Sequence, residues 1–105
     1  MDVDQHLPLA PRDLMVLAVL AEGPLHGYGL IKAVEERSES GVLLDPANLY
    51  RMLRRMRALG WIEEAGDESE RRRTHRITGH GRTVLAAELG RLERILTQAR
   101  PAVQG

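Results

Sequence analysis

The stretch 45–77 constrains the fold most, because a helix with two contrasting faces leads directly into a hairpin. Asp45 can cap the first free N–H groups of a helix, Pro46 suits the first turn, and Gly60 is a natural stop. The apolar side chains of the segment are Leu49, Met52, Leu53, Met56 and Leu59. Their helical spacing places them on one side, so we expect that side to join the core.

The opposite side of this predicted helix is rich in arginine. Its outward residues are Ala47, Arg51, Arg54 and Arg55, with Tyr50 and Arg57 on one flank and Asn48 on the other. A charged helix face is usually only solvated, but no acidic residue lies within 46–60 to pair with these arginines along the helix. The small Ala47 would also permit close approach to a groove. The pattern therefore favours contact with DNA.

The residues after this helix predict a β-hairpin that forms a wing. Strands are expected over 61–64 and 73–77, with a polar turn over 65–72 that bends at Gly66-Asp67. Trp61 follows the helix stop directly, so we expect it to pack at the base of the wing rather than to stack on a ligand.

Arginine also marks the end of the predicted wing. Arg71, Arg72 and Arg73 could lie against phosphates or a minor groove. The alternative is a solvated loop in which Asp67, Glu68 and Glu70 neutralise these arginines.

Three more helices are expected, near 11–21, 27–38 and 78–98. His26 and Thr78 are candidate caps for the second and the last of them. The chain is therefore predicted to be mainly α with a small β-hairpin. We interpret it as a winged helix-turn-helix with a C-terminal dimerisation helix.

The predicted domain organisation follows these elements. We expect a flexible N-terminus over 1–10, a DNA-binding domain over 11–80, a dimerisation helix over 81–98 and a flexible tail over 99–105. The last helix carries more apolar surface than a core this small can cover, which favours a partner. The residues expected at the dimer interface are Leu14, Leu17, Leu85, Leu89, Leu92, Ile95 and Leu96. Alternatively, part of this set packs back on the first helix within one subunit.

Charge is distributed unevenly along the chain. The formal net charge is zero, which alone argues against a nucleic-acid partner. Residues 1–45 hold three basic and eight acidic residues, whereas residues 46–82 hold nine arginines and five acidic residues. Positive charge thus concentrates on the segment that is predicted to read DNA.

Composition and motif content also argue against several other kinds of protein. The chain has no cysteine, so disulfides and thiolate metal sites are excluded. The acidic N-terminus does not resemble a secretory signal and no apolar run suggests a membrane span, so a cytoplasmic protein is expected. His75 and His80 could join an acid in a metal site, but such a pair alone is weak evidence. We find no nucleophile–base pair or carboxylate dyad in context, so we expect no enzyme and no cofactor.

With these residues placed, the chain resembles the PadR family of bacterial transcriptional regulators over about 14–96. The matching motifs are Leu25-His26-Gly27-Tyr28, Pro46-Ala47-Asn48-Leu49-Tyr50, Leu53-Arg54-Arg55-Met56 leading to Leu59-Gly60-Trp61-Ile62, and Arg76-Ile77-Thr78 with Gly81. Ala47-Asn48 and Arg51 depart from the family pattern in the recognition helix, so the operator sequence is expected to differ from the family's best-known sites. Thr74-His75 stands where aromatic residues are frequent in the family, which leaves the wing strand less aromatic.

The resemblance implies a homodimeric repressor, often of its own gene and of detoxification or efflux genes, that a small-molecule effector can release. A dimer would place two recognition helices roughly 34 Å apart on an inverted repeat of double-stranded DNA. We expect Asn48, Arg51 and Arg54 to read bases. We expect the backbone contacts from Tyr28, Lys32, Tyr50 and Arg55. The alternatives are a winged-helix protein-interaction module without DNA binding and a metal-responsive repressor.

Overall fold

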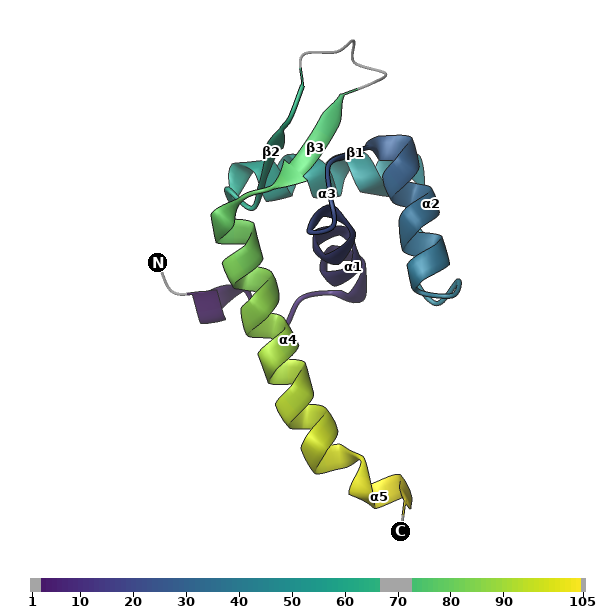
Figure 1. The fold of residues 1–105 in the computed structure, drawn as a ribbon, viewed down its shortest axis with the longest axis vertical. Coiled ribbons are helices and arrows are strands. Elements are labelled where there is room, and N and C mark those ends of the chain that lie inside the picture. The colour runs from purple at the N-terminus through teal and green to yellow at the C-terminus, as the bar shows by residue number, and fades with distance from the viewer. Residues whose placement is uncertain (1–2, 67–72, 105) are drawn as a thin grey trace.

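The computed structural model describes residues 3–66 and 73–104 of the chain. Its elements are the 3-10 helix η1 (Val3–His6), α1 (Pro11–Leu20), β1 (Leu25–His26), α2 (Gly27–Arg37), α3 (Pro46–Ala58), β2 (Ile62–Glu64), β3 (Thr74–Ile77), α4 (Gly79–Ala99) and α5 (Pro101–Gln104). Helices α1 to α3 lie together beneath the sheet, and α4 extends well beyond them (Figure 1). The predicted winged helix-turn-helix with a long last helix is confirmed.

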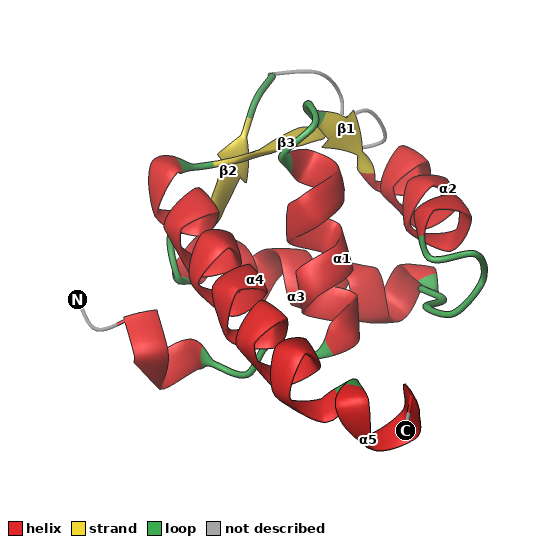
Figure 2. Cartoon of the chain, turned by 60° about the horizontal axis from the view of Figure 1, so that its bottom comes forward, coloured by secondary structure: helices red, strands yellow, loops and turns green. Residues whose placement is uncertain are grey.

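The sheet has three antiparallel strands in the order β1-β3-β2 and lies along one side of the helices (Figure 2). Within the hairpin, Ile62 pairs with Ile77 and Glu64 pairs with His75. The two-residue strand β1 pairs Leu25 with His75, and the sequence analysis missed it. So short a strand shows no alternation, and only its tertiary partner β3 defines it.

The prediction that α3 has clear caps and one buried apolar face is confirmed. Asp45 caps its start by accepting the backbone N–H of Asn48 at 2.9 Å. The helix ends where Gly60 adopts a φ of +78°, and the Trp61 N–H donates to the Met56 carbonyl across this turn. The four buried residues of α3 are Leu49, Met52, Leu53 and Met56. All four belong to the apolar face that the spacing predicts.

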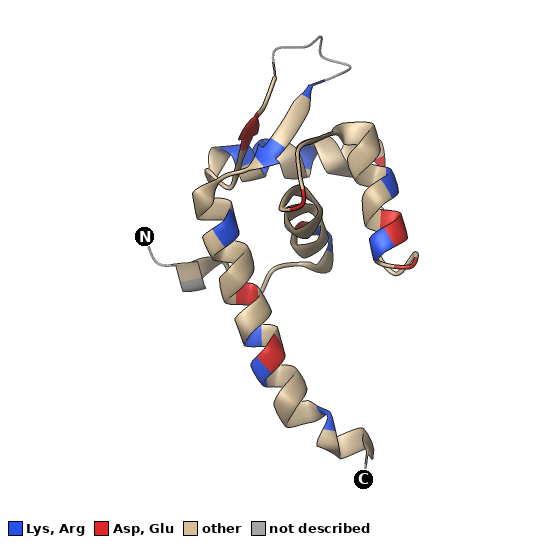
Figure 3. Cartoon of the chain, viewed as in Figure 1, with Lys and Arg blue, Asp and Glu red and all other residues tan. Residues whose placement is uncertain are grey.

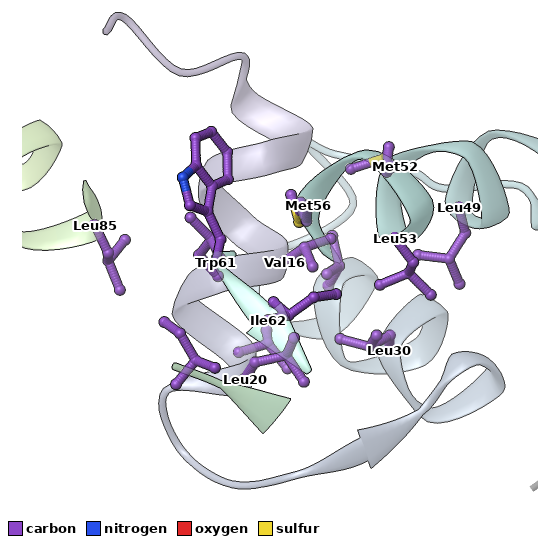
Figure 4. Close-up of a cluster of buried hydrophobic side chains, with 14 of the residues drawn as sticks. Val16, Leu20, Leu30, Leu49, Met52, Leu53, Met56, Trp61, Ile62 and Leu85 are labelled. Carbon is purple, nitrogen blue, oxygen red and sulfur yellow. The ribbon is translucent and has the colours of Figure 1, made fainter. Parts of the chain in front are cut away.

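The core joins this face to α1, α2 and the start of the wing (Figure 4). Val16, Leu30 and Met56 are fully buried, and Trp61 is 2% exposed. Trp61 therefore packs at the base of the wing, as expected. Its ring also makes an edge contact with His6, with the two ring centroids 5.3 Å apart.

The N-terminal segment differs from the flexible tail that the sequence predicts. Val3–His6 forms a short helix that contacts α4, and Leu9 is buried at 8% exposure. The Leu9 N–H donates at 2.7 Å to the carboxylate of Glu88, which is itself 1% exposed and paired with Arg91. The contact with Arg91 lowers the pKa of Glu88. Leu9 and Glu88 are 79 residues apart, so no local pattern could predict this contact.

The last helix also differs in part from expectation. Thr78 caps α4 by accepting the Gly81 N–H at 3.0 Å, as predicted. Leu17 and Leu85, however, are buried inside the subunit at 0% and 7% exposure. Assigning these two to a dimer interface is therefore wrong, because neither offers a partner an exposed side chain. No helix in the described ranges is long and apolar enough to span a membrane.

The start of α4 packs against the wing so closely that glycine is required at Gly81. A Cβ added there would lie 2.1 Å from the Trp61 carbonyl oxygen and 2.8 Å from Ile77 Cγ1. Gly81→Ala should therefore destabilise the fold by about 2–3 kcal/mol or more, because the backbone must shift. Gly79→Ala is the matched control, since nothing lies within 4 Å of a Cβ there. Urea unfolding of both variants checks this; equal midpoints would contradict it.

Candidate nucleic-acid interface

The outward face of α3 forms an exposed surface together with the start of α2 and the wing. Ala47, Arg51 and Arg54 are exposed, and Tyr50 on the flank is 64% exposed. Tyr28, from the first turn of α2, is 70% exposed beside it. Basic residues gather on α3 and β3 at this end of the molecule (Figure 3). The structure thus brings together residues from three of the motifs identified in the sequence.

Asn48 and Arg51 are connected to the cap of α3. The Asp45 carboxylate accepts the Asn48 backbone N–H through one oxygen and the Asn48 side-chain Nδ2 through the other, at 2.6 Å. Arg51 Nη2 in turn donates to Asn48 Oδ1. Asn48 and Arg51, two of the predicted DNA-contact residues, therefore form one chain of hydrogen bonds with the cap residue Asp45.

Arg55 is engaged by a carboxylate that the sequence analysis did not consider. Its Nη2 contacts both oxygens of Asp13, at 2.6 and 2.7 Å. Asp13 lies on α1 and is 6% exposed, whereas half of the Arg55 side chain is exposed. The absence of acids within α3 therefore does not leave all its arginines unpaired. The expected phosphate contact of Arg55 would use guanidinium N–H groups other than the Nη2 that donates to Asp13.

Arg57 and Arg73 share the carboxylate of Glu64, at 3.5 and 3.3 Å. This arrangement ties α3 to β2 and to the residue that directly precedes β3. Arg54 differs, because it makes no hydrogen bond or ion pair with any residue in the described ranges. Lys32 is likewise exposed and forms no ion pair with a residue of the described ranges, whereas Arg71 and Arg72 lie outside those ranges.

A groove of about 510 Å³ separates α2 and α3 from the wing. Its lining includes Tyr28, Ile31, Leu49, Tyr50, Arg54, Arg57, Arg73 and His75. Sequence reasoning named the tyrosines, Arg54 and Arg73, but it assigned no role here to Arg57 and considered His75 only as a metal ligand. The groove forms where residues of α2, α3 and the β3 side of the wing come together in the tertiary structure, which no motif in the sequence specifies.

His75 is buried beneath this groove at 4% exposure, and its Nδ1 has no hydrogen-bond partner among the described residues. Burial, together with nearby Arg57, lowers the pKa of His75, because both disfavour the imidazolium. Within the described ranges no group of three or more His, Cys, Asp or Glu residues is arranged to hold a metal ion. The histidine pair thus gains no support as a metal site.

Comparison with known proteins agrees with this architecture. The model of the Transcriptional regulator PadR-like family matches residues 16–87. An uncharacterised 37.1 kDa protein in transposon Tn4556 of Streptomyces fradiae is 37% identical over 82 residues, or 78% of this chain. The chain spans 23% of the length of that protein.

Two solved structures have the same fold. A PadR family transcription regulator from Clostridium difficile R20291 has a TM-score of 0.75 at 19% identity, with coverage of 90% of this chain and 99% of that one. Bacillus subtilis PadR, in complex with operator DNA, has a TM-score of 0.65 at 19% identity. That comparison covers 78% of this chain and 47% of the Bacillus chain.

The contact between Asp13 and Arg55 should stabilise the position of α3 against α1. Asp13→Asn should lower the free energy of unfolding by about 1–3 kcal/mol, because it neutralises the buried carboxylate that accepts hydrogen bonds from Arg55. Glu63→Ala is the control, since its pair with Arg76 is about half exposed on both sides and should contribute under about 1 kcal/mol. Chemical unfolding measures both variants. An Asp13→Asn midpoint no lower than that of the control would contradict this role.

Proposed function

The chain belongs to the PadR-like family of transcriptional regulators, and we propose that it represses transcription by binding an inverted-repeat operator as a homodimer. The observation that carries the proposal is the exposed face of α3, where Arg51 and Arg54 project beside Tyr28 and Tyr50. A helix of this kind fits the major groove, and its flanking tyrosines and Lys32 could contact phosphates. The Bacillus relative solved with operator DNA supports this use of the fold.

The wing would lie beside the recognition helix on the duplex. Glu64 holds Arg57 and Arg73 at the junction of α3 and the hairpin, so the wing and the helix would meet DNA as one unit. Arg71 and Arg72, which directly precede Arg73 in the sequence, are proposed to add positive charge for phosphate contacts.

Dimerisation is proposed through the far part of α4. Leu89, Ile95 and Leu96 are 44%, 45% and 50% exposed on a helix that projects beyond the rest of the fold (Figure 1). Leu92 and Leu14 are partly buried and could contribute at the edge of the interface. A second copy would cover this apolar surface and set the spacing of the two recognition helices.

Effector control is a further part of the proposal. The groove between α3 and the wing has room for a small molecule, and its lining shares Tyr28, Tyr50 and Arg54 with the proposed DNA surface. A compound bound there would compete directly with the operator and relieve repression. Detoxification, efflux or membrane-protein genes beside its own are the proposed targets, by resemblance to the family.

The competing function is a winged-helix protein-interaction module without DNA binding. Fluorescence anisotropy with the DNA upstream of the chain's own gene separates the two. A regulator should bind this DNA with a steep salt dependence, because arginines displace condensed counterions.

Arg54→Ala should weaken operator binding by roughly 5- to 150-fold, equivalent to about 1–3 kcal/mol, because this exposed cation would contact a base or phosphate. Arg37→Ala is the control, since Arg37 lies at the other end of α2 from Tyr28 and pairs with Glu22. Anisotropy titrations at one fixed salt concentration compare them. Equal affinities for the two variants would argue against the assignment.

The proposed dimer predicts a particle of twice the 11.7 kDa chain mass in light scattering. Replacing both Ile95 and Leu96 with Glu should shift the protein to the monomer, because two carboxylates would be buried at the interface. Val103→Glu serves as the control: Val103 is 87% exposed on α5, beyond the proposed interface. A double variant that keeps the wild-type mass would exclude this face as the interface.

A further inference from the structure

We propose that Asn48 is a positioning residue that holds Arg51 for reading guanine, and that Asp45 sets the orientation of Asn48. The inference rests on the proposed function, because it divides roles within the DNA-reading face. It revises the expectation that Asn48 and Arg51 each read a base independently.

The hydrogen bonds connect the Arg51 guanidinium to the helix cap, and each one is donated toward Asp45. One oxygen of Asp45 accepts the Asn48 backbone N–H at 2.9 Å, and the other accepts Asn48 Nδ2 at 2.6 Å. The opposite end of the amide, Oδ1, accepts a hydrogen bond from Arg51 Nη2. The NH₂ group of the Asn48 side chain therefore donates to a carboxylate, and its oxygen accepts from a guanidinium.

Asp45 determines which end of the amide faces Arg51. In the reversed orientation, Oδ1 would face the Asp45 carboxylate and the two N–H donors of Nδ2 would face the guanidinium. Both contacts would be repulsive, so one orientation is selected. The cap of α3 thus also directs the side chain of a residue three positions along the helix.

This geometry favours guanine over adenine as the base that is read. Asparagine recognises adenine by using its oxygen and its NH₂ group together, but here each already has a protein partner. Arginine carries five N–H donors, so one contact to Asn48 leaves donors for O6 and N7 of guanine. Held by Asn48, Arg51 also has less rotamer freedom to lose on binding.

Arg54 provides an internal comparison. It is exposed on the same helix but makes no hydrogen bond or ion pair with a residue in the described part of the chain. No hydrogen bond or ion pair from residues 3–66 or 73–104 orients Arg54 in advance, so its contribution should not depend on Asn48 or Asp45.

The test begins with selection of bound sequences from random double-stranded DNA by the full-length protein. The wild type should prefer guanine at one base pair of the half-site, and Arg51→Ala should abolish that preference, a loss of roughly 5- to 150-fold. Asn48→Ala should reduce the preference at the same base pair. The double variant should be no worse than Arg51→Ala alone, because the two residues act as a unit. Arg54→Ala should lower the overall affinity without changing this preference, and Arg37→Ala, outside the proposed DNA-binding surface, is the control that should change neither.

Asp45→Asn separates the orientation of Asn48 from helix capping. Asparagine caps about as well as aspartate, but its NH₂ group cannot accept a hydrogen bond from Asn48 Nδ2. The variant should keep the wild-type unfolding midpoint and lose part of the guanine preference. Its affinity for unrelated DNA should rise or stay equal, because a negative charge is removed.

Several results would overturn the inference. One is loss of preference at a different base pair in Asn48→Ala, with additive effects in the double variant, since Asn48 would then read its own base. A second readout needs no DNA: the Asn48 side-chain amide resonances should shift in Arg51→Ala and in Asp45→Asn. Unchanged resonances would overturn the inference while leaving the regulator proposal intact. If the wild type enriched no sequence, the regulator proposal itself would fail.

Discussion

Burial of one face of α3 is the constraint on which the rest of the molecule depends. Leu49, Leu53 and Met56 are at most 2% exposed, and burying side chains of this size contributes about 1.5–3 kcal/mol each. A helix that buries one face against α1, α2 and Trp61 must turn the other outward. The exposed arginines and tyrosines are therefore a geometric consequence of how the core packs.

Neighbouring elements then give each outward arginine of α3 a different environment. Arg55 is held by buried Asp13 and Arg57 by Glu64 of the wing, whereas Arg54 has no partner in the ranges described. A helix whose own turns carry no carboxylate thus obtains carboxylates from α1 and β2. In the proposed regulator, Arg55 and Arg57 would therefore hold the helix in place as well as lie at the DNA-facing surface, whereas Arg54 would be available to DNA alone.

Helix α4 connects the core to the proposed dimer interface. Its first turns are buried through Gly81, Val84 and Leu85, and they pack against the base of the wing. Its distal turns expose apolar residues that the single chain leaves uncovered. In the proposed dimer, α4 would therefore set the position of each DNA-binding face relative to the other, because the close packing of Gly81 against Trp61 leaves little room for α4 to shift.

Local structure could be predicted from the residues alone: the helical spacing of α3, its caps at Asp45 and Gly60, the wing strands and the Thr78 cap. These features depend on side chains a few residues apart, which periodicity and capping chemistry describe directly. Three features became visible only in the folded chain: Asp13 pairs with Arg55, 42 residues away, Leu9 packs at Glu88 rather than in a loose tail, and Leu17 and Leu85 face inward. Such contacts follow from how the packed elements meet in space, so a linear pattern could place residues on a face but could not identify their partners.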